Sequence, residues 1–279
     1  MRIDSHQHFW QPARGDYDWM PMDNAILARP YVLSDLALHL EACGIGATVL
    51  VQAAATVCET EYMLGIADAT PSVAGVVGWV DFENPSDLET LKRLSKHPKF
   101  KGVRPMIQDI PDVDWMHRED VQWGFRALCD FDLTFDALGF PRHLDNFLKL
   151  LKRYPDMRAV VDHCMKPQIR SHGEQSFRVW ADGMARIADQ TRACCKLSGL
   201  VTEAAPEWTE ADLAPYASHV ISAFGAERVM WGSDWPVCRL ASDYETWFAT
   251  AEGFAAGLSA ADQGEIFGGT AKRFYRLEV

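Results

Sequence analysis

Eight short apolar runs alternate with longer amphipathic stretches along this chain, and the alternation limits the folds that it can adopt. Most of the runs are too short for helices and lack a polar–apolar alternation, as expected of strands that are covered on both faces. They span residues 2–5, 47–52, 73–80, 101–104, 133–136, 158–162, 193–197 and 228–231. Strands that alternate with helices are typical of βα units around a parallel sheet.

The stretches between the runs carry signals for the start and end of helices. Ser34 opens one stretch that ends at Gly44, capping-box spacing after Pro85 begins another, and a third runs from Pro141 to Tyr154. Further helices are expected over residues 117–130, 174–190, 209–224, 243–257 and 259–276. The irregular segments 9–33, 105–116, 164–173, 198–208 and 235–242 each follow a predicted strand.

Eight alternations predict a (β/α)8 TIM-like barrel, although a doubly wound sheet gives a similar pattern. Such barrels typically have about 250 residues, so the 279 residues fit one domain over 1–279, and 48% hydrophobic residues suffice for a large core. Closure is favoured because candidate catalytic residues follow both the first and the last run, and only a closed barrel makes those strands neighbours. The irregular segments would then form the catalytic rim.

Composition narrows the function. A net charge of -12 argues against a nucleic-acid partner, because phosphate binding needs clustered basic residues. Seven cysteines without C-x-x-C spacing fit a reducing cytoplasm better than a disulfide framework. Neither a secretory signal nor a membrane span is expected, so the predicted partner is a small molecule. The sequence leaves the oligomeric state open.

Four candidate catalytic residues fall at predicted strand ends. His6 and His8 belong to one strand and should share a face, about 6 to 7 Å apart. His163 ends the sixth run, and Asp234 follows the eighth. Together they could bind one Zn²⁺ or Mn²⁺ ion, or form a metal-free polarising site with Asp234 as the base.

These motifs resemble the amidohydrolase superfamily. The resemblance rests on His6-x-His8, on Asp162-His163 with Lys166-Pro167, and on Gly232-Ser233-Asp234-Trp235-Pro236. Within the superfamily the chain is similar to the sugar lactonases that act on L-fuconolactone and L-rhamnonolactone, with kinship to a pyrone-dicarboxylate lactonase. The resemblance implies a distorted barrel and attack of water on a polarised carbonyl.

The chain also departs from the pattern of this superfamily at two strand ends. The fourth and fifth strands end at Arg104 and Asp136, with no carboxylated-lysine or bridging-glutamate pattern. We therefore expect at most one ion, held by His6, His8, His163 and Asp234 in some combination and not strictly required.

Other residues receive supporting roles. Arg104 is expected to donate to the lactone oxygens, and substrate binding is expected of Trp10, Trp235, Lys166 and Gln52. Asp4 should share the face of His6 and His8 and either have a structural role or fix a histidine tautomer. By strand alternation Asp162 should point away from the His163 face and be architectural.

The leading hypothesis is a lactonase that opens L-fuconolactone or a similar neutral sugar-acid lactone to its aldonate. Water attacks the carbonyl while Asp234 accepts its proton. A metal-dependent decarboxylase or hydro-lyase of the same superfamily is the alternative, but its anionic substrate should require more basic residues at the rim. A non-catalytic ligand-binding barrel is the third hypothesis, and it should have lost one of the four residues.

Overall fold

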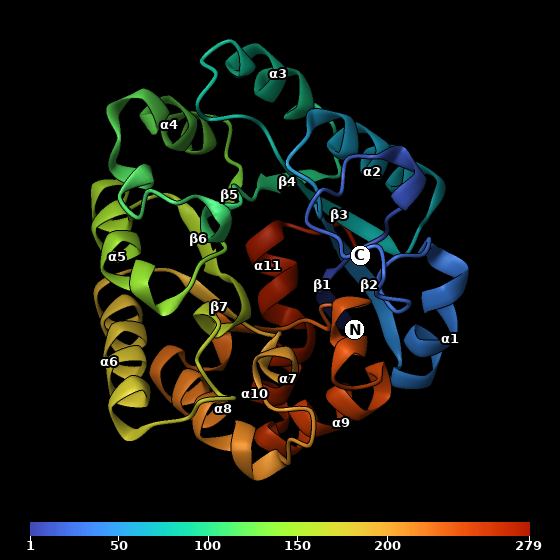
Figure 1. Ribbon diagram of the computed structural model, residues 1–279, viewed down its shortest axis with the longest axis vertical. Helices are drawn as coiled ribbons and strands as arrows, with labels where there is room; N and C mark the ends of the chain where they lie inside the picture. The colour runs from blue at the N-terminus through green and yellow to red at the C-terminus, as the bar shows by residue number, and fades with distance from the viewer.

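The computed structural model describes residues 1–279, and its centre is an eight-stranded sheet wound into a barrel (Figure 1). The strands follow one another in chain order and each pairs parallel to the next. They are β1 (Arg2–Gln7), β2 (Ile45–Val51), β3 (Val73–Gly78), β4 (Phe100–Val103), β5 (Thr134–Ala137), β6 (Arg158–Val161), β7 (Cys194–Leu197) and β8 (Val229–Trp231). All eight predicted runs are therefore strands, and the barrel prediction is confirmed.

The seam between β1 and β8 is closed by residues that follow β8. The N–H of Asp234 donates to the carbonyl of His6 at 2.8 Å, and the N–H of His8 donates to the carbonyl of Trp235 at 2.7 Å. Backbone pairing thus places Asp234 directly beside the two histidines.

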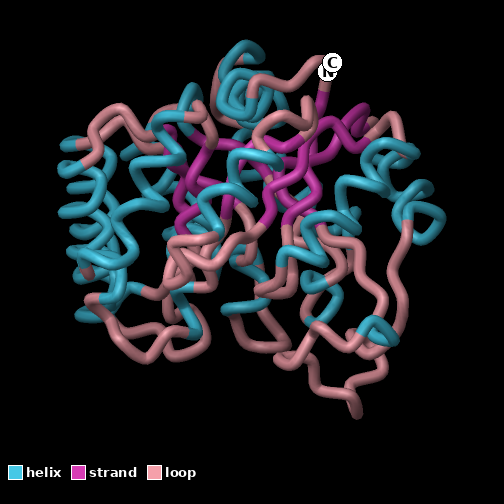
Figure 2. Tube along the Cα trace, turned by 90° about the horizontal axis from the view of Figure 1, so that it is seen from above, coloured by secondary structure: helices cyan, strands magenta, loops and turns pink.

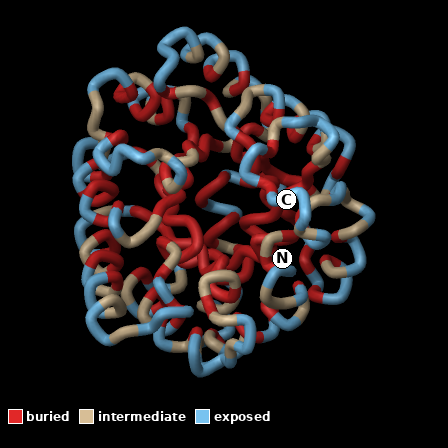
Figure 3. The backbone as a smooth tube through the Cα atoms, viewed as in Figure 1, coloured by how far each residue is buried: buried red, intermediate tan, exposed pale blue.

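Helices surround the barrel, with their outer faces exposed and the strands buried (Figure 3). They are α1 (Leu33–Cys43), α2 (Val57–Ala69), α3 (Asp87–Leu94), α4 (Gln122–Asp130), α5 (Leu144–Arg153), α6 (Glu174–Gln190), α7 (Leu200–Glu203), α8 (Glu210–Phe224), α9 (Tyr244–Ala255), α10 (Ala260–Gly264) and α11 (Thr270–Tyr275). No helix combines the length and apolar composition needed to cross a bilayer.

Three helical segments differ from the sequence prediction. Helix α2 is not predicted, because its buried side includes the polar Glu59 and Thr60 and so weakens the apolar pattern. The helix expected over 259–276 is divided into α10 and α11 by a π-helical turn, Glu265–Gly269. Helix α7 lies in a segment expected to be irregular.

One end of the barrel is closed by the C-terminal helix. Phe274 and Tyr275 of α11 pack into a buried cluster with interior strand residues such as Ile3, Val77 and Val160. In Figure 2 both termini lie at this end, and the long loops gather at the opposite, C-terminal end of the strands. The loop side is the end at which TIM barrels carry their active sites.

Candidate active site

The four residues predicted from strand ends meet at the loop side of the barrel. His8 Nε2 lies 3.2 Å from His6 Nε2 and 3.3 Å from Asp234 Oδ1. Asp234 Oδ1 is also 3.7 Å from His6 Nε2 and 3.9 Å from His163 Nε2. All four side chains are almost fully buried. One carboxylate oxygen is thus surrounded by three imidazoles.

A cavity of about 210 Å³ opens in front of this cluster. Its lining includes the charged or polar side chains of His8, His163, Asp234, Arg104, Gln108 and Lys166 and the rings of Trp10 and Trp19, but not His6. Lys166 Nζ donates to Gln108 Oε1 at 2.6 Å. The cavity thus combines charged groups with aromatic faces, as small-molecule sites do.

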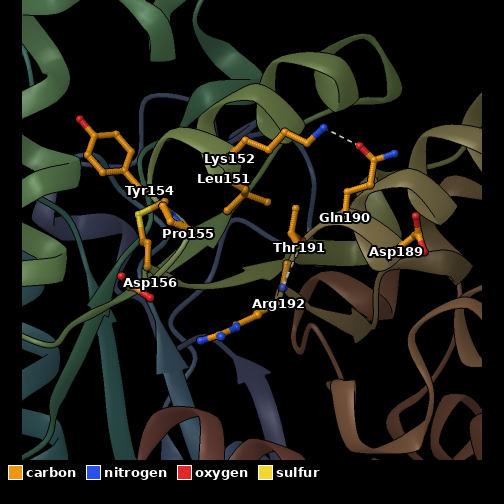
Figure 4. A pocket seen from close by; sticks show the side chains of 11 residues that line it. Leu151, Lys152, Tyr154, Pro155, Asp156, Asp189, Gln190, Thr191 and Arg192 are labelled. Carbon is orange, nitrogen blue, oxygen red and sulfur yellow. Dashed lines mark hydrogen bonds between the residues drawn. The ribbon is translucent and has the colours of Figure 1, made fainter.

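A larger cavity of about 380 Å³ lies at the other end of the barrel (Figure 4). It is lined by residues 151, 152, 154–157 and 189–193, which precede β6 and β7, and Lys152 Nζ donates to Gln190 Oε1 at 2.5 Å. It contains none of the predicted site residues, and this face of a TIM barrel ordinarily serves stability. The chemistry therefore lies in the smaller cavity.

Two of the catalytic candidates, His163 and Asp234, lie in left-handed backbone that sets the direction of their side chains. His163, Cys164, Met165 and Lys166 all have left-handed φ values between 47° and 60°. A left-handed turn of non-glycine residues costs roughly 1–2 kcal/mol per residue. Asp234 is also left-handed, with φ 56°. Such strain persists at functional sites where surrounding structure enforces it.

Burial and charge set the protonation of the site. Burial lowers the pKa of His163 to about 4, so this imidazole is neutral at neutral pH. Burial alone would raise the pKa of Asp234, but His163, His8 and His6 outweigh it and hold this pKa well below its ordinary value. Asp234 is therefore a carboxylate at neutral pH.

A buried charge network that we do not predict from sequence lies beneath the histidines. Lys196 Nζ donates to Asp136 Oδ2 at 2.6 Å, forms an ion pair with Asp162 Oδ1 at 2.9 Å, and lies 3.0 Å from His6 Nδ1. Tyr275 of α11 donates to Asp136 Oδ2 at 2.7 Å. These side chains are all inside the barrel, so the network joins the closed end to the catalytic cluster.

The expected orientation of Asp162 is wrong, whereas Asp4 has the structural role, one of the two that we expect for it. Asp162 points into the barrel, on the same face as Val160 two residues earlier, and it is His163 that leaves the strand pattern by its left-handed turn. Asp4 accepts from the backbone N–H groups of His6 and Ser233 and from the hydroxyl of Tyr244. These bonds join Asp4 to the backbone and to Tyr244 and involve no histidine ring.

Arg104 is more deeply placed than expected. It is 4% exposed, donates to the backbone carbonyl of Gln52, and has NH1 3.4 Å from Asp162 Oδ2 and 3.3 Å from His6 Nε2. The Gln52 amide donates to the Arg104 carbonyl at 2.9 Å. Gln52 therefore holds Arg104 from behind and is absent from the cavity wall.

Of the two tryptophans expected to bind substrate, only Trp10 reaches the cavity. Its indole N–H donates to the Leu27 carbonyl at 3.1 Å. Trp235 is buried behind the wall against Phe9 and Tyr31. Trp19, which sequence reasoning did not identify, takes a place in the wall instead.

Glu59 supports the turn after β2 that contributes to the cavity wall. Its carboxylate accepts from the N–H groups of Ala53, at 3.0 Å, and Ala54, at 2.6 Å. Burial raises the pKa of Glu59 to about 7. Because the pKa of Glu59 is higher in the folded chain than the ordinary value of 4.5, the folded state is favoured while the carboxyl is protonated. This contribution to the free energy of unfolding is complete below pH 4.5 and is lost as the pH rises through 7.

We therefore expect the stability difference between wild type and Glu59→Gln to depend on pH. Between pH 5 and 8 the free energy of unfolding of wild type, measured in urea, should fall by about 2 kcal/mol relative to that of the variant. One pKa unit corresponds to about 1.4 kcal/mol. A difference that does not change with pH would mean that Glu59 titrates alike in the folded and unfolded chains.

Comparison with known proteins agrees with this geometry. The chain is 41% identical to an L-fucono-1,5-lactonase of Burkholderia ambifaria and 35% identical to one of Burkholderia multivorans, each over 99% of this chain and 96% of the relative. Two crystal structures of a B. multivorans amidohydrolase, with bound HEPES and with bound zinc, superpose with TM-scores of 0.94 and 0.93 at 35% identity over 99% of both chains. Since the amidohydrolase family model also matches residues 3–277, the chain belongs to the amidohydrolase family.

Proposed function

We propose that the protein is a lactonase that hydrolyses a neutral sugar-acid lactone, with L-fucono-1,5-lactone as the first substrate to test. The observation that carries the proposal is the Asp234 carboxylate, which lies among three imidazoles and lines a cavity of about 210 Å³ together with His8 and His163. The two L-fucono-1,5-lactonases that are similar over nearly the whole chain support the choice of substrate.

The geometry supports a mechanism based on one carboxylate base. Asp234 accepts a proton from a water molecule whose oxygen bonds to the lactone carbonyl carbon. Negative charge on the carbonyl oxygen is stabilised by N–H donors from His163 and from Arg104 NH1, which both line the cavity. When the bond to the ring oxygen breaks, that oxygen takes the proton from Asp234, and the products are a hydroxyl and a carboxylic acid that ionises.

The cavity wall suggests how the sugar is held. We propose that the Trp10 and Trp19 faces pack against the apolar C–H face of the ring, and that Lys166 and Gln108 bind hydroxyls. Gln52 and Trp235 do not line the cavity; we propose that Gln52 positions Arg104 and that Trp235 positions the loop that carries Asp234. A cytoplasmic enzyme of one domain, residues 1–279, is proposed on the seven free thiols and the single barrel.

The donor set also fits a metal ion. One ligand atom from each of His6, His163 and Asp234 lies within 4.8 Å of the others, and these are the donors that Zn²⁺ and Mn²⁺ accept. Membership of the family and the zinc-bound relative suggest a metal. An ion there would polarise the carbonyl as a Lewis acid. We propose at most one ion, not strictly required.

The function is tested by measuring proton release from a panel of aldonolactones, with aromatic carboxylic acids as a second panel. Hydrolysis of L-fucono-1,5-lactone with a preference over its stereoisomers is expected. Decarboxylation of an aromatic acid without hydrolysis of any lactone would overturn the proposal in favour of the decarboxylase alternative.

Exhaustive chelation should leave most of the lactonase activity, because His163 and Arg104 supply the donors without an ion. The measurement is kcat before and after chelation, with the residual metal determined by mass spectrometry. Complete loss that one equivalent of Zn²⁺ or Mn²⁺ restores would show that the metal is essential.

Gly199→Ala should lower kcat by about 10- to 100-fold, because misplacement of a catalytic group by about 1 Å can cost a hundredfold. Gly199 has φ +69°, and an added Cβ would lie 2.8 Å from Cβ and Nδ1 of His163. The imidazole must therefore move. Gly173→Ala is the control, since its new Cβ would meet only Ser176 Oγ at 3.4 Å. Equal kcat in both variants would show that the position of His163 does not matter.

A further inference from the structure

A second cavity opens at the loop side of the barrel, beside the catalytic one. Its volume is about 550 Å³, and it is lined by residues 55, 79–83, 105, 106, 109–112, 115 and 118. Most of these residues follow β3 and β4, which are neighbouring strands (Figure 1). Met106 and Asp109 line both cavities. The two cavities therefore meet at these two side chains.

Neither side chain at this boundary is held firmly. Asp109 is exposed, and its carboxylate accepts only from the amide of the adjacent Gln108, at 3.4 Å. Met106 is unbranched, and methionine side chains adapt to the shape of what they contact. A molecule bound in one cavity can therefore extend into the other by movement of two side chains.

Three aromatic side chains, Trp79, Phe82 and Trp115, line the second cavity. The rings of Phe82 and Trp115 are 21° from parallel, with their centroids 6.2 Å apart. The indole N–H of Trp115 donates to Glu83 Oε1 at 3.1 Å, which fixes this ring. Such rings offer contact area to the apolar C–H face of a pyranose.

The polar groups of this cavity are only partly used within the chain. Asp81 Oδ1 accepts from the N–H of Glu83 at 2.9 Å, and Asp112 Oδ1 accepts from the N–H of Asp114 at 3.0 Å. The second oxygen of each carboxylate has no hydrogen bond, and the indole N–H of Trp79 has no acceptor. A sugar hydroxyl can donate to such oxygens and accept from such an N–H.

Charge narrows the class of ligand further. Arg118 is the one cation that lines the cavity, and it is paired with Glu83 at 2.7 Å and with Asp120. The carboxylates of Asp81 and Asp112 have no cationic partner, so an anionic ligand would be repelled. A quaternary ammonium could contact the rings and carboxylates, but it could not accept from the Trp79 N–H. A neutral sugar uses all three kinds of group.

We propose that this second cavity, the outer subsite, binds a neutral glycosyl unit attached to the lactone. The proposal rests on the lactonase function proposed above: the lactone ring occupies the catalytic cavity, and its substituent passes between Met106 and Asp109 into the outer subsite. The substrate class then includes glycosylated aldonolactones. Contacts to a remote, unreacting part of a substrate can raise kcat/KM.

The kinetic test compares L-fucono-1,5-lactone with its derivatives glucosylated or galactosylated at O2, O3 or O4, by proton release corrected for spontaneous hydrolysis. For at least one derivative, kcat/KM should exceed that of the parent lactone by about 10-fold, the scale of one favourable aromatic contact. Trp79→Ala should remove this gain and leave the parent lactone within a few-fold. No gain for any derivative, or a gain that survives Trp79→Ala, overturns the proposal.

Two matched variants separate the outer subsite from general effects of losing a tryptophan. Trp19→Ala, which alters the catalytic cavity alone, should lower kcat/KM for parent and derivative alike. Trp208 lines neither cavity, and its indole N–H donates to the Ala241 carbonyl at 2.9 Å, so Trp208→Ala should leave the ratio of the two unchanged. Should Trp79→Ala not fold, Asp112→Ala, at an exposed position, takes its place.

A binding measurement tests the outer subsite without turnover. Isothermal titration with the methyl β-glycosides of glucose and galactose should show binding of at least one to wild type and to Trp19→Ala, and its loss in Trp79→Ala. Choline chloride is the cationic probe, and tighter binding of choline than of either glycoside would overturn the proposal, as would binding of neither glycoside. If the enzyme hydrolyses no lactone, the proposed function fails, whereas glycoside binding that depends on Trp79 would still establish the subsite.

Discussion

Asp234→Asn is expected to lower kcat for the lactone at least about 100-fold, the lower range for loss of a positioned general base. An amide cannot accept the proton of the attacking water, whereas the carboxylate is ionised throughout the neutral range because the histidines hold its pKa low. Folding should be little affected. Asn is one of the few residues that tolerate a left-handed φ of 56°, and the backbone bond from position 234 to His6 is kept.

The effect is measured as kcat per folded enzyme, with circular dichroism and urea unfolding as checks of structure. Asp109→Asn is the matched control, because Asp109 lines the same cavity but is exposed and makes no contact with a histidine. It should retain kcat within a few-fold. Near wild-type turnover in Asp234→Asn would remove Asp234 from the mechanism.

The fold could be predicted from the sequence because its strands are buried on both faces. Such strands appear as short apolar runs whatever their neighbours are, so all eight are recognisable. Closure of the barrel could be argued from His6 and Asp234, since these residues must meet if both are catalytic. Helix α2 could not be recognised, because Glu59 faces inward to cap the Ala53 turn and interrupts the apolar pattern.

The site could be predicted only where residues stand at strand ends. His6, His8, His163 and Asp234 come together for that reason. Lys196 lies within β7, and its partners Asp136 and Asp162 belong to other strands, so no local spacing links them. A usable signal was present: charged residues inside or at the ends of fully buried strands must be paired with one another.

Arg104 is identified from its position at the end of a strand, but its surroundings differ from those expected from the sequence. From sequence we expect Arg104→Met to change stability by no more than about 1 to 2 kcal/mol, provided that the guanidinium faces the rim. The structure places it 4% exposed, with NH1 3.4 Å from the fully buried Asp162. Removing one partner of a buried ion pair costs about 3–5 kcal/mol, and Asp162 keeps Lys196 as its other partner. We therefore expect Arg104→Met to lower the free energy of unfolding by about 3 kcal/mol.

Arg104→Met should also reduce catalysis in the molecules that remain folded. Loss of one oxyanion donor typically costs about 10²- to 10³-fold in kcat, and Arg104 lines the cavity together with His8, His163 and Asp234. Equilibrium unfolding in urea gives the stability, and kcat per folded molecule gives the catalytic effect. Arg186→Met, which breaks an exposed pair with Asp145, is the control and should change neither measurably. A stability loss with normal turnover of the folded fraction would make Arg104 structural and leave oxyanion stabilisation to His163.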